Sequence, residues 1–316
     1  MPMSELKFVN ANDLVQLGAQ DMLAQPRLPE WLRKGQTHYE AVQALKMELR
    51  QRRLHTVCES ARCPNMHECF ERSAATFMIL GNLCTRGCGF CSVPKGSPNK
   101  KEFGLDPEEP FHVAEMAARM RLKYVVITSV NRDDLADGGS AHFAETVRQV
   151  RLVLKHARVE VLTPDFCGDW AAVARVLDAG PHVFNHNMET VKRLYRRVRP
   201  QANYLQSLEV LRFAKQHRPD VLTKSGLMVG LGESMEEVRE LLRDIRSANV
   251  DVATIGQYLQ PTRRNLPVAE YVTPRQFDEY RDYGLSKGFN TVFSGPFVRS
   301  SYMAELVSEE AVQAHA

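Results

Sequence analysis

Short runs of β-branched and aromatic residues alternate with longer helical stretches from residue 75 onward. The runs predict strands at 75–81, 124–130, 158–163, 182–187, 222–230 and 251–259. The intervening stretches predict helices near 107–122, 140–156, 169–179, 188–217 and 234–248. Strands that are each followed by a helical segment are typical of a parallel β/α architecture, either an open sheet or a barrel.

Polar residues gather at the carboxyl ends of these strands, and they favour a barrel over an open sheet. In a barrel enzyme, side chains from many strand ends meet at one catalytic rim. The strand-end residues are Thr128, Ser129, Thr163, Asp165, Asn185, His186, Asn187, Lys224, Ser225 and Gln257. We therefore expect a partial (β/α)6 TIM-type barrel over residues 75–289.

Two extensions flank the predicted barrel. Residues 1–74 form an N-terminal extension, in which 38–54 reads "HYEAVQALKMELRQRRL" and predicts an amphipathic helix. Residues 290–316 form a C-terminal extension that begins with a short predicted strand, "NTVFSG", and includes "RSSY". The apolar face of such a helix needs a surface to cover, so we expect it to pack on another part of the chain.

Composition and charge exclude several classes of protein. The 316 residues are 44% hydrophobic and 25% charged, as in an ordinary soluble globular protein. A formal charge of +3 is too small to favour nucleic acid as a partner. The chain shows no leader-like N-terminus and no apolar run of the ~18 residues needed to span a bilayer. We expect a cytoplasmic protein that binds neither nucleic acid nor membrane.

The seven cysteines are unevenly distributed. In an intracellular protein, thiols serve metal binding or catalysis more often than disulfides. Six of them lie between Cys58 and Cys91, whereas Cys167 stands alone. We expect Cys167 to be a small buried apolar residue without a role.

Cys84, Cys88 and Cys91 have the spacing C-x3-C-x2-C and directly follow the first predicted strand. Three thiolates at that rim can hold three irons of a 4Fe-4S cluster and leave the fourth iron open. A zinc site completed by a distant histidine is the alternative. A ferredoxin-type cluster needs a fourth cysteine, which the nearby sequence does not offer.

Cys58, Cys63 and Cys69 form a second triplet with the spacing C-x4-C-x5-C. It also has no fourth thiol, and His67 can complete a zinc site there. The neighbouring open-cluster motif makes a second iron-sulfur centre the more economical interpretation.

Several sequence blocks together resemble one family. The C-x3-C-x2-C motif with an aromatic residue, Phe90, before its third cysteine is similar to the signature of the radical S-adenosylmethionine (SAM) superfamily. From about Trp31 to Tyr302 the chain resembles the lipoyl synthase family. The blocks that carry the resemblance are "TVCESARCPNMHECF", "ATFMILGNLCTRGCGFC", "TSVNRDDLADGG", "FNHNMETV", "SGLMVGLGE", "QYLQPT" and "SGPFVRSSY".

The resemblance implies an activity and two 4Fe-4S clusters. Cys84, Cys88 and Cys91 match the ligands of a cluster whose open iron binds SAM. Reductive cleavage of SAM then yields a radical that abstracts hydrogen at C6 and C8 of a protein-bound octanoyl chain, where sulfur is inserted. An auxiliary cluster, consumed as the sulfur donor, is held in this family by the second triplet and a serine of R-S-S-Y. By position in that motif we expect the serine to be Ser301 rather than Ser300.

The resemblance also implies contacts and partners. The expected SAM-binding residues are Phe90, Thr128, Ser129, Asn131, Asn185 and Asn187. Family members often carry Asp where Asn131 stands, so this chain has a neutral amide at that position. The implied partners are octanoylated lipoyl carrier domains (E2 subunits of 2-oxoacid dehydrogenases and the glycine cleavage H protein), flavodoxin or ferredoxin as electron donor, and a cluster-assembly carrier.

Two questions stay open at the level of sequence. The run 191–200, "VKRLYRRVRP", is either a solvated helix face or a docking patch for an acidic carrier domain. The alternative functions are another two-cluster radical SAM enzyme with a different substrate, and an electron-transfer or zinc-binding module.

Overall fold

The computed structural model describes residues 28–33, 39–61, 63–71, 74–96 and 104–301. The chain divides into two compact units, Met1–Arg33 and Lys34–Ala316. In the first unit, the described residues form the 3-10 helix η1 (Glu30–Leu32), and Arg33 Nε donates to the Leu28 carbonyl oxygen at 3.3 Å. Everything below concerns the second unit.

Its framework is one eight-stranded sheet whose strands follow the chain order from β1 to β8. β2 to β8 pair in parallel, and β1 pairs antiparallel with β2. Among the described residues the edge strands β1 and β8 do not pair with each other, so the barrel is open. The strands are β1 (His55–Thr56), β2 (Ala74–Ile79), β3 (Tyr124–Ser129), β4 (Arg158–Leu162), β5 (Val183–Asn185), β6 (Leu222–Val229), β7 (Val252–Gln257) and β8 (Thr291–Gly295).

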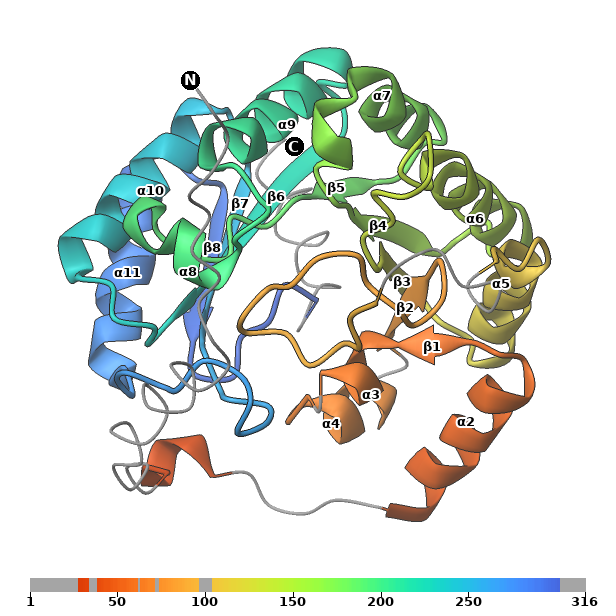
Figure 1. Cartoon of the computed structure of the whole chain (residues 1–316), viewed down its shortest axis with the longest axis horizontal. Helices are drawn as coiled ribbons and strands as arrows, with labels where there is room; N and C mark the ends of the chain where they lie inside the picture. Colours follow the sequence, from red (N-terminus) through yellow and green to blue (C-terminus); the bar gives the residue numbers. More distant parts are fainter. Residues whose placement is uncertain (1–27, 34–38, 62, 72–73, 97–103, 302–316) are drawn as a thin grey trace, which may run out of the picture. The chain divides into compact units, whose positions relative to one another are not determined.

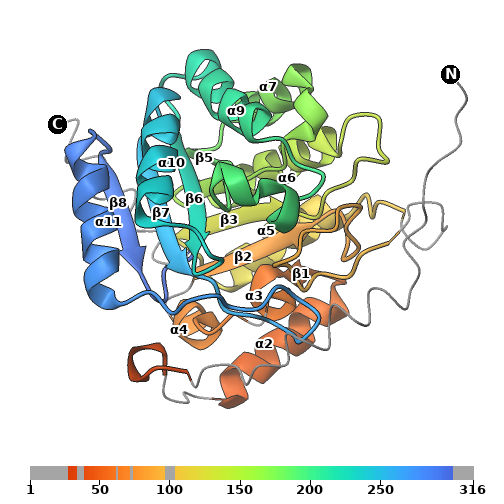
Figure 2. The same cartoon turned by 60° about the vertical axis from the view of Figure 1, so that its left-hand side comes forward.

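Helices cover the outer face of the sheet (Figure 1), and α10 and α11 lie beside β7 and β8 (Figure 2). Two apolar clusters fill the space between helices and strands, one on the β2–β5 side and one on the β6–β8 side. The helices are α2 (Tyr39–Gln51), α3 (Val57–Ser60), α4 (Met66–Glu71), α5 (Glu109–Arg119), α6 (Ser140–Val153), α7 (Trp170–Asp178), α8 (Tyr195–Val198), α9 (Tyr204–His217), α10 (Met235–Ser247) and α11 (Pro274–Ser286), with the 3-10 turns η3 (Phe166–Gly168) and η4 (Lys192–Leu194). None of the described helices is both long and apolar enough to cross a membrane.

Local sequence explains where several helices begin. The Ser234 hydroxyl accepts from the Glu237 N–H, and the Glu237 carboxylate accepts from the Ser234 N–H, which is a capping box at the start of α10. Thr273 and Gln276 form the same arrangement at α11, where Pro274 occupies the first helical position. Such caps satisfy backbone groups that the helix itself leaves unpaired.

The partial barrel predicted from sequence is confirmed, with two differences in its elements. The six predicted strands are present, and β1 and β8, from the flanking segments, join the same sheet. The helical stretch predicted near 188–217 is divided into three pieces, since the chain forms η4, α8 and α9 there. Pro200 accounts for the break, since the residue before a proline avoids helical angles and Arg199 has φ −134° and ψ 69°.

Candidate functional site

The loop of residues 80–96 follows β2 and carries Cys84, Cys88 and Cys91. It leaves the strand through two left-handed residues, Leu80 at φ 68° and Gly81 at φ 87°. Cys84 N–H donates to the Pro94 carbonyl oxygen, and Gly96 N–H donates to the Cys84 carbonyl oxygen. These bonds close the loop on itself, so its three thiols stay together.

Backbone contacts from three other elements fix the position of this loop. Thr85 N–H donates to the Asn131 carbonyl oxygen after β3, and Gly89 N–H donates to the Val198 carbonyl oxygen of α8. The Gly89 carbonyl oxygen accepts from Leu266 N–H, in the segment after β7. A Cβ atom at Gly89 would lie 2.9 Å from the Leu266 side chain, so a larger residue here would have to displace that side chain.

Arg86, between Cys84 and Cys88, anchors the cysteine loop to the loops that follow β3 and β4. Its guanidinium donates to the Asp133 carboxylate at 2.7 and 2.9 Å and to the Asp165 carboxylate at 2.6 and 3.0 Å. Burial alone would raise the pKa of Asp165, but Arg86 outweighs that effect and holds the pKa at about 2. Burial likewise disfavours the Arg86 cation, yet the two carboxylates raise its pKa above the usual range. The pair therefore stays charged at neutral pH.

The three thiols line one cavity in the barrel mouth, together with Phe90, whose ring also packs on the β6–β8 apolar cluster. None of the three cysteines forms a disulfide. Burial raises the pKa of Cys88, and raises that of Cys91 to about 11. Binding an iron-sulfur group at these thiols therefore releases protons, because the ligand is the thiolate.

Buried polar atoms without a partner among the described residues converge on the same cavity. All belong to side chains that line it: Ser129 Oγ, Asn131 Oδ1, Thr163 Oγ1, His186 Nε2 and Asn187 Oδ1. Buried polar atoms in proteins are nearly always hydrogen-bonded, so a cluster of unpaired ones indicates a polar ligand. The cavity thus combines three thiols with a polar wall, which fits an iron-sulfur cluster and a polar cofactor such as SAM.

The structure brings together most of the residues expected to contact SAM. Phe90, Thr128, Ser129, Asn131 and Asn187 line the cavity. Asn131 also donates to Cys84 Sγ, from its backbone nitrogen at 3.4 Å and from Nδ2 at 3.8 Å.

Asn185 is not among the lining residues. Its Nδ2 donates to Glu160 Oε1 at 3.0 Å, inside the barrel. Lys224 Nζ lies 3.1 Å from both Glu160 carboxylate oxygens, and the Tyr124 hydroxyl donates to Oε2 at 2.7 Å. Asn185 therefore belongs to a buried polar cluster, which we call the interior network and which consists of Tyr124, Glu160, Asn185 and Lys224.

Sequence reasoning missed four charged residues of the cavity wall, which are Arg86, Lys95, Glu189 and Arg199. Burial raises the pKa of Glu189, although Arg199 opposes that shift. Arg199 Nη1 donates to the Asn187 carbonyl oxygen at 2.9 Å. Nothing in the sequence separates Arg199 from the other basic residues of 191–200, because only the fold turns it inward.

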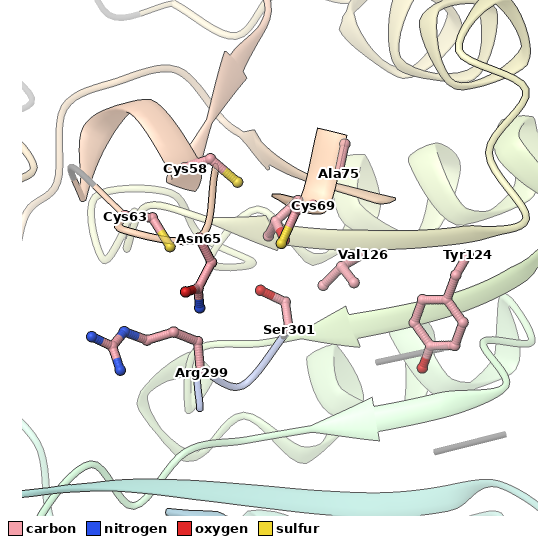
Figure 3. A pocket seen from close by; sticks show the side chains of 10 residues that line it. Cys58, Cys63, Asn65, Cys69, Ala75, Tyr124, Val126, Arg299 and Ser301 are labelled. Atoms are coloured by element: carbon pink, nitrogen blue, oxygen red, sulfur yellow. The ribbon is translucent and has the colours of Figure 1, made fainter. Parts of the chain in front are cut away.

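A second cavity contains the other cysteine triplet. Cys58, Cys63 and Cys69 line it together with Ser301 and Arg299. Figure 3 shows the three thiols and the Ser301 hydroxyl pointing into the same space. Burial raises the pKa of Cys58 above its usual range, and the neighbouring Cys63 and Cys69 raise it further.

Contacts of the C-terminal segment explain how Ser301 reaches the triplet. Asn65 Nδ2, between Cys63 and Cys69, donates to the Phe297 carbonyl oxygen at 2.7 Å. At Gly256 of β7, a Cβ atom would collide with the Val298 carbonyl oxygen, so the segment passes directly over the strand. Ser300 is not among the residues that line the cavity, and Tyr302 lies outside the described residues.

The inward faces of β2 and β3 connect the two cavities. Thr76 and Val126 line the second cavity, and Met78 and Thr128, two positions further along each strand, line the first. Residues two apart on a strand share a face and lie about 7 Å apart. The two thiol triplets therefore occupy successive levels of one barrel interior.

The structure also bears on the zinc alternatives. In the described part of the chain, no three His, Cys, Asp or Glu side chains are grouped as one metal ion requires. The thiols instead surround cavities, which fits a larger group better than a single ion. The His67 side chain, the proposed fourth zinc ligand, lies outside what the structure describes.

Two other expectations have opposite outcomes. His186 is a buried, hydrogen-bonded strand-end residue as expected, with Nδ1 2.9 Å from the Thr163 carbonyl oxygen. The expectation that Cys167 is buried is wrong, because its side chain is exposed. It sits at φ 52° in the turn η3, and its Sγ lies 3.3 Å from both Arg86 Nη2 and Asp133 Oδ1.

Comparison with known proteins gives two family matches and close relatives. Residues 78–245 match the Radical SAM superfamily, and residues 7–63 match the N-terminal domain of lipoyl synthase of the Radical SAM family. A lipoyl synthase of Rubrobacter xylanophilus is 54% identical over 283 residues, which cover 90% of this chain and 87% of that protein. One of Chloroflexus aggregans is 49% identical over 309 residues, covering 97% and 96%.

Solved structures share the fold at low sequence identity. The [FeFe]-hydrogenase maturase HydG superposes with a TM-score of 0.53 at 14% identity, over 87% of this chain and 64% of that one. Streptococcus suis SuiB bound to S-adenosylmethionine gives a TM-score of 0.53 at 10% identity, over 73% and 53%. The chain thus spans less than two thirds of each, and these likenesses show the fold alone.

Proposed function

The chain belongs to the lipoyl synthase family of the radical SAM superfamily, and we propose that it inserts sulfur at C6 and C8 of a protein-bound octanoyl-lysine. The observation that carries this proposal is the stacking of two thiol-lined cavities along the inward faces of β2 and β3. A sulfur-inserting radical enzyme needs a site that generates the radical and a sulfur source within reach of the same carbon atoms.

We assign Cys84, Cys88 and Cys91 to a 4Fe-4S cluster with an open iron position. When bound, this cluster supplies the electron that cleaves SAM. The protein's own contribution is orientation, through the unpaired polar atoms of Ser129, Asn187 and the other wall residues. Asn131 donates to Cys84 Sγ and so holds one ligand sulfur in place.

We assign Cys58, Cys63, Cys69 and Ser301 to the auxiliary cluster. When bound, this cluster supplies the inserted sulfur. A serine oxygen is a harder ligand than a thiolate and holds soft, sulfur-bridged iron less well, which suits a cluster that must come apart. Arg299 lines the same cavity, and its positive charge favours the thiolate form of Cys63.

Both thiol-lined cavities have an apolar side that suits an octanoyl chain. Val57, Met78 and Leu162 give the first cavity apolar lining, and Val126 and Ala75 do so in the second. Burial of a straight hydrocarbon chain is favourable by about 0.8 kcal/mol per methylene. We propose that the chain lies along this apolar side, with the interior network as its polar boundary.

The partners follow from the substrate and the chemistry. We propose octanoylated lipoyl carrier domains as substrates, with E2 subunits of 2-oxoacid dehydrogenases and the glycine cleavage H protein among them. Flavodoxin or ferredoxin supplies electrons, a cluster-assembly carrier restores the auxiliary cluster, and the reaction takes place in the cytoplasm.

The test is anaerobic reconstitution with iron and sulfide, followed by mass spectrometry of an octanoyl-lysyl peptide after incubation with SAM and dithionite. We expect the peptide to gain two sulfurs as a dithiol under dithionite, and to lose two hydrogens only when the dithiol is afterwards oxidised to the disulfide, together with release of 5′-deoxyadenosine. Iron content near ~8 per chain distinguishes two clusters from a zinc-binding or electron-transfer module. 5′-Deoxyadenosine without a change in the peptide would favour a different radical SAM activity.

A further inference from the structure

Four exposed arginines flank the loop of residues 80–96. Arg196 and Arg197 belong to α8, and Arg263 and Arg264 belong to the segment after β7. None of the four side chains forms an ion pair or hydrogen bond with a residue that the structure describes. We call these four residues the arginine rim.

The two halves of the arginine rim meet at Gly89. Gly89 N–H donates to Val198, the residue after Arg197, and the Gly89 carbonyl oxygen accepts from Leu266. A Cβ atom at Gly89 would lie 3.3 Å from the Arg197 carbonyl oxygen. Asn265, the neighbour of Arg264, donates from Nδ2 to the carbonyl oxygens of Gly89 at 3.2 Å and of Cys91 at 2.9 Å. Both halves are therefore bonded to the peptide groups between Cys88 and Cys91.

Arg193 lies in the same basic run but differs in its contacts. Its guanidinium donates to both Glu237 carboxylate oxygens, at 2.6 and 2.9 Å, and to the Gly232 carbonyl oxygen at 2.8 Å. Its charge is already balanced within this chain. The basic run therefore does not act as one patch. Within the part of the chain that the structure describes, Arg193 pairs with Glu237, whereas Arg196 and Arg197, next to the cysteine loop, have no ion pair.

We propose that the arginine rim is the docking surface for an acidic electron-transfer protein. Unpaired surface arginines attract an acidic partner and raise the rate of productive encounter. A partner on this rim is positioned against the loop that holds the three cluster cysteines. This inference rests on the proposed function, since it takes these cysteines as the ligands of the cluster that must be reduced.

The geometry favours an electron donor over the carrier domain. Electron transfer slows steeply with distance, so a donor has to bind close to the ligands that it reduces. A carrier domain instead presents its octanoyl group on a long lysine arm, so its body need not touch the cysteine loop. With flavodoxin as donor, the flavin hydroquinone loses one electron to become the semiquinone, and this chain gains that electron.

The experiment compares two reductants and two substrates. The variant R196A/R197A/R263A/R264A removes the arginine rim. The matched control R148A/R243A/R275A/K287A removes four exposed cations from α6, α10 and the two ends of α11. Both variants carry the same net charge, so a general loss of positive charge affects them equally.

Stopped-flow oxidation of flavodoxin hydroquinone by the reconstituted enzyme measures electron transfer directly, and fluorescence anisotropy of labelled flavodoxin measures binding. At low ionic strength we expect the rim variant to lose at least ~10-fold in both and to show a flatter salt dependence. With dithionite, we expect peptide and carrier domain to be converted at the parental rate. The control variant should match the parent throughout.

Three results would overturn the proposal: equal losses with dithionite and flavodoxin, equal losses in the control variant, or losses confined to the carrier domain under dithionite. The last result would assign the arginine rim to the carrier. Failure of the parent to convert the peptide under dithionite would overturn the proposed function instead, and flavodoxin binding would still report on the rim.

Discussion

The Arg86 guanidinium and the Asp165 carboxylate form a two-point ion pair that joins the cysteine loop to the end of β4. The pair is almost fully buried, with side-chain exposures of 5% and 1%. Asp133, in the loop after β3, forms a second ion pair with the same guanidinium. One residue inside the C-x3-C spacing thus connects the cluster loop to the loops that follow two successive strands.

Breaking this pair should weaken both the fold and the retention of the cluster. Replacing Asp165 by Asn leaves the buried Arg86 cation with Asp133 as its remaining carboxylate, so the loss should be below the ~3–5 kcal/mol that an uncompensated buried charge costs. We expect D165N to lower the midpoint of thermal unfolding and to lose iron faster to a chelator. Arg86→Lys should behave similarly, because an ammonium cannot form the planar two-sided contact.

The matched control is Asp220→Asn. Asp220 pairs with Arg218 through two hydrogen bonds, but its side chain is 66% exposed. Surface ion pairs contribute little, so D220N should resemble the parent. Equal iron loss in D220N and D165N would contradict a specific role for the Arg86 pair.

His186 should make stability depend on pH in a defined window. Burial, helped by the nearby Arg199 charge, lowers the pKa of His186 to about 4, against an ordinary value of 6.5. Between these values the unfolded chain binds a proton that the folded chain does not. The free energy of unfolding therefore falls by about 3 kcal/mol as pH drops from 6.5 to 4, with no further loss from this group below pH 4.

Urea unfolding of parent and His186→Gln at several pH values checks this prediction. We expect the slope between pH 6.5 and 4 to be smaller in His186→Gln, while His217→Gln, at an exposed site on α9, keeps the parental slope. Asp165 acts in a separate window, since its stabilisation is lost only as pH falls from 3.8 towards 2. A slope that persists unchanged in H186Q would rule out His186 as its source.

The fold and the thiol sites differ in how far sequence could predict them. The strand over 124–130 was predictable because it begins with a continuous apolar run, which is typical of buried parallel strands. β1 was missed because two residues, His55 and Thr56, carry no periodicity. It becomes a strand only through its pairing with Phe77 and Met78.

Most of the features that the sequence could not predict depend on contacts between segments that are far apart in the chain. The cysteine spacing was visible as a local motif, but the partners of Arg86 come from segments 47 and 79 residues away. Asn185 looked like a rim residue because it ends a strand, yet its side chain turns to Glu160 inside the barrel. The position of a residue at the end of a strand predicts that its backbone lies at the rim of the barrel. Which way its side chain points depends on how the neighbouring strands are aligned with it.

The interior network should be sensitive to single changes but tolerant of a paired one. Glu160→Gln leaves the buried Lys224 ammonium without its counter-charge, which should cost about 3–5 kcal/mol. Replacing both residues, as E160Q/K224M, should recover much of that loss, because a buried ion pair gains little over neutral groups of similar size. Equilibrium unfolding of E160Q, K224M and E160Q/K224M measures the coupling free energy between Glu160 and Lys224. Additive losses would contradict a direct ion pair.

Ser301 and Ser300 provide a matched pair for testing the auxiliary site. Both are partly buried serines in the same segment, but only Ser301 lines the cavity with Cys58, Cys63 and Cys69. We expect Ser301→Ala to cleave SAM reductively at close to the parental rate, because the first cavity is untouched. It should form less than ~1% of the lipoyl product, since the sulfur-supplying site lacks a ligand.

Ser300→Ala should retain both activities, and Ser301→Cys should retain an iron-sulfur group while releasing sulfur more slowly, because thiolate is the softer and stronger ligand for such iron. Mass spectrometry of the peptide, alongside 5′-deoxyadenosine and iron counts, separates these outcomes. Full product formation by S301A would remove the serine from the ligand set. Loss of product in S300A, with S301A unaffected, would make Ser300 the ligand instead. We expect Ser301 to be the ligand because it is the serine that lines the cavity in Figure 3.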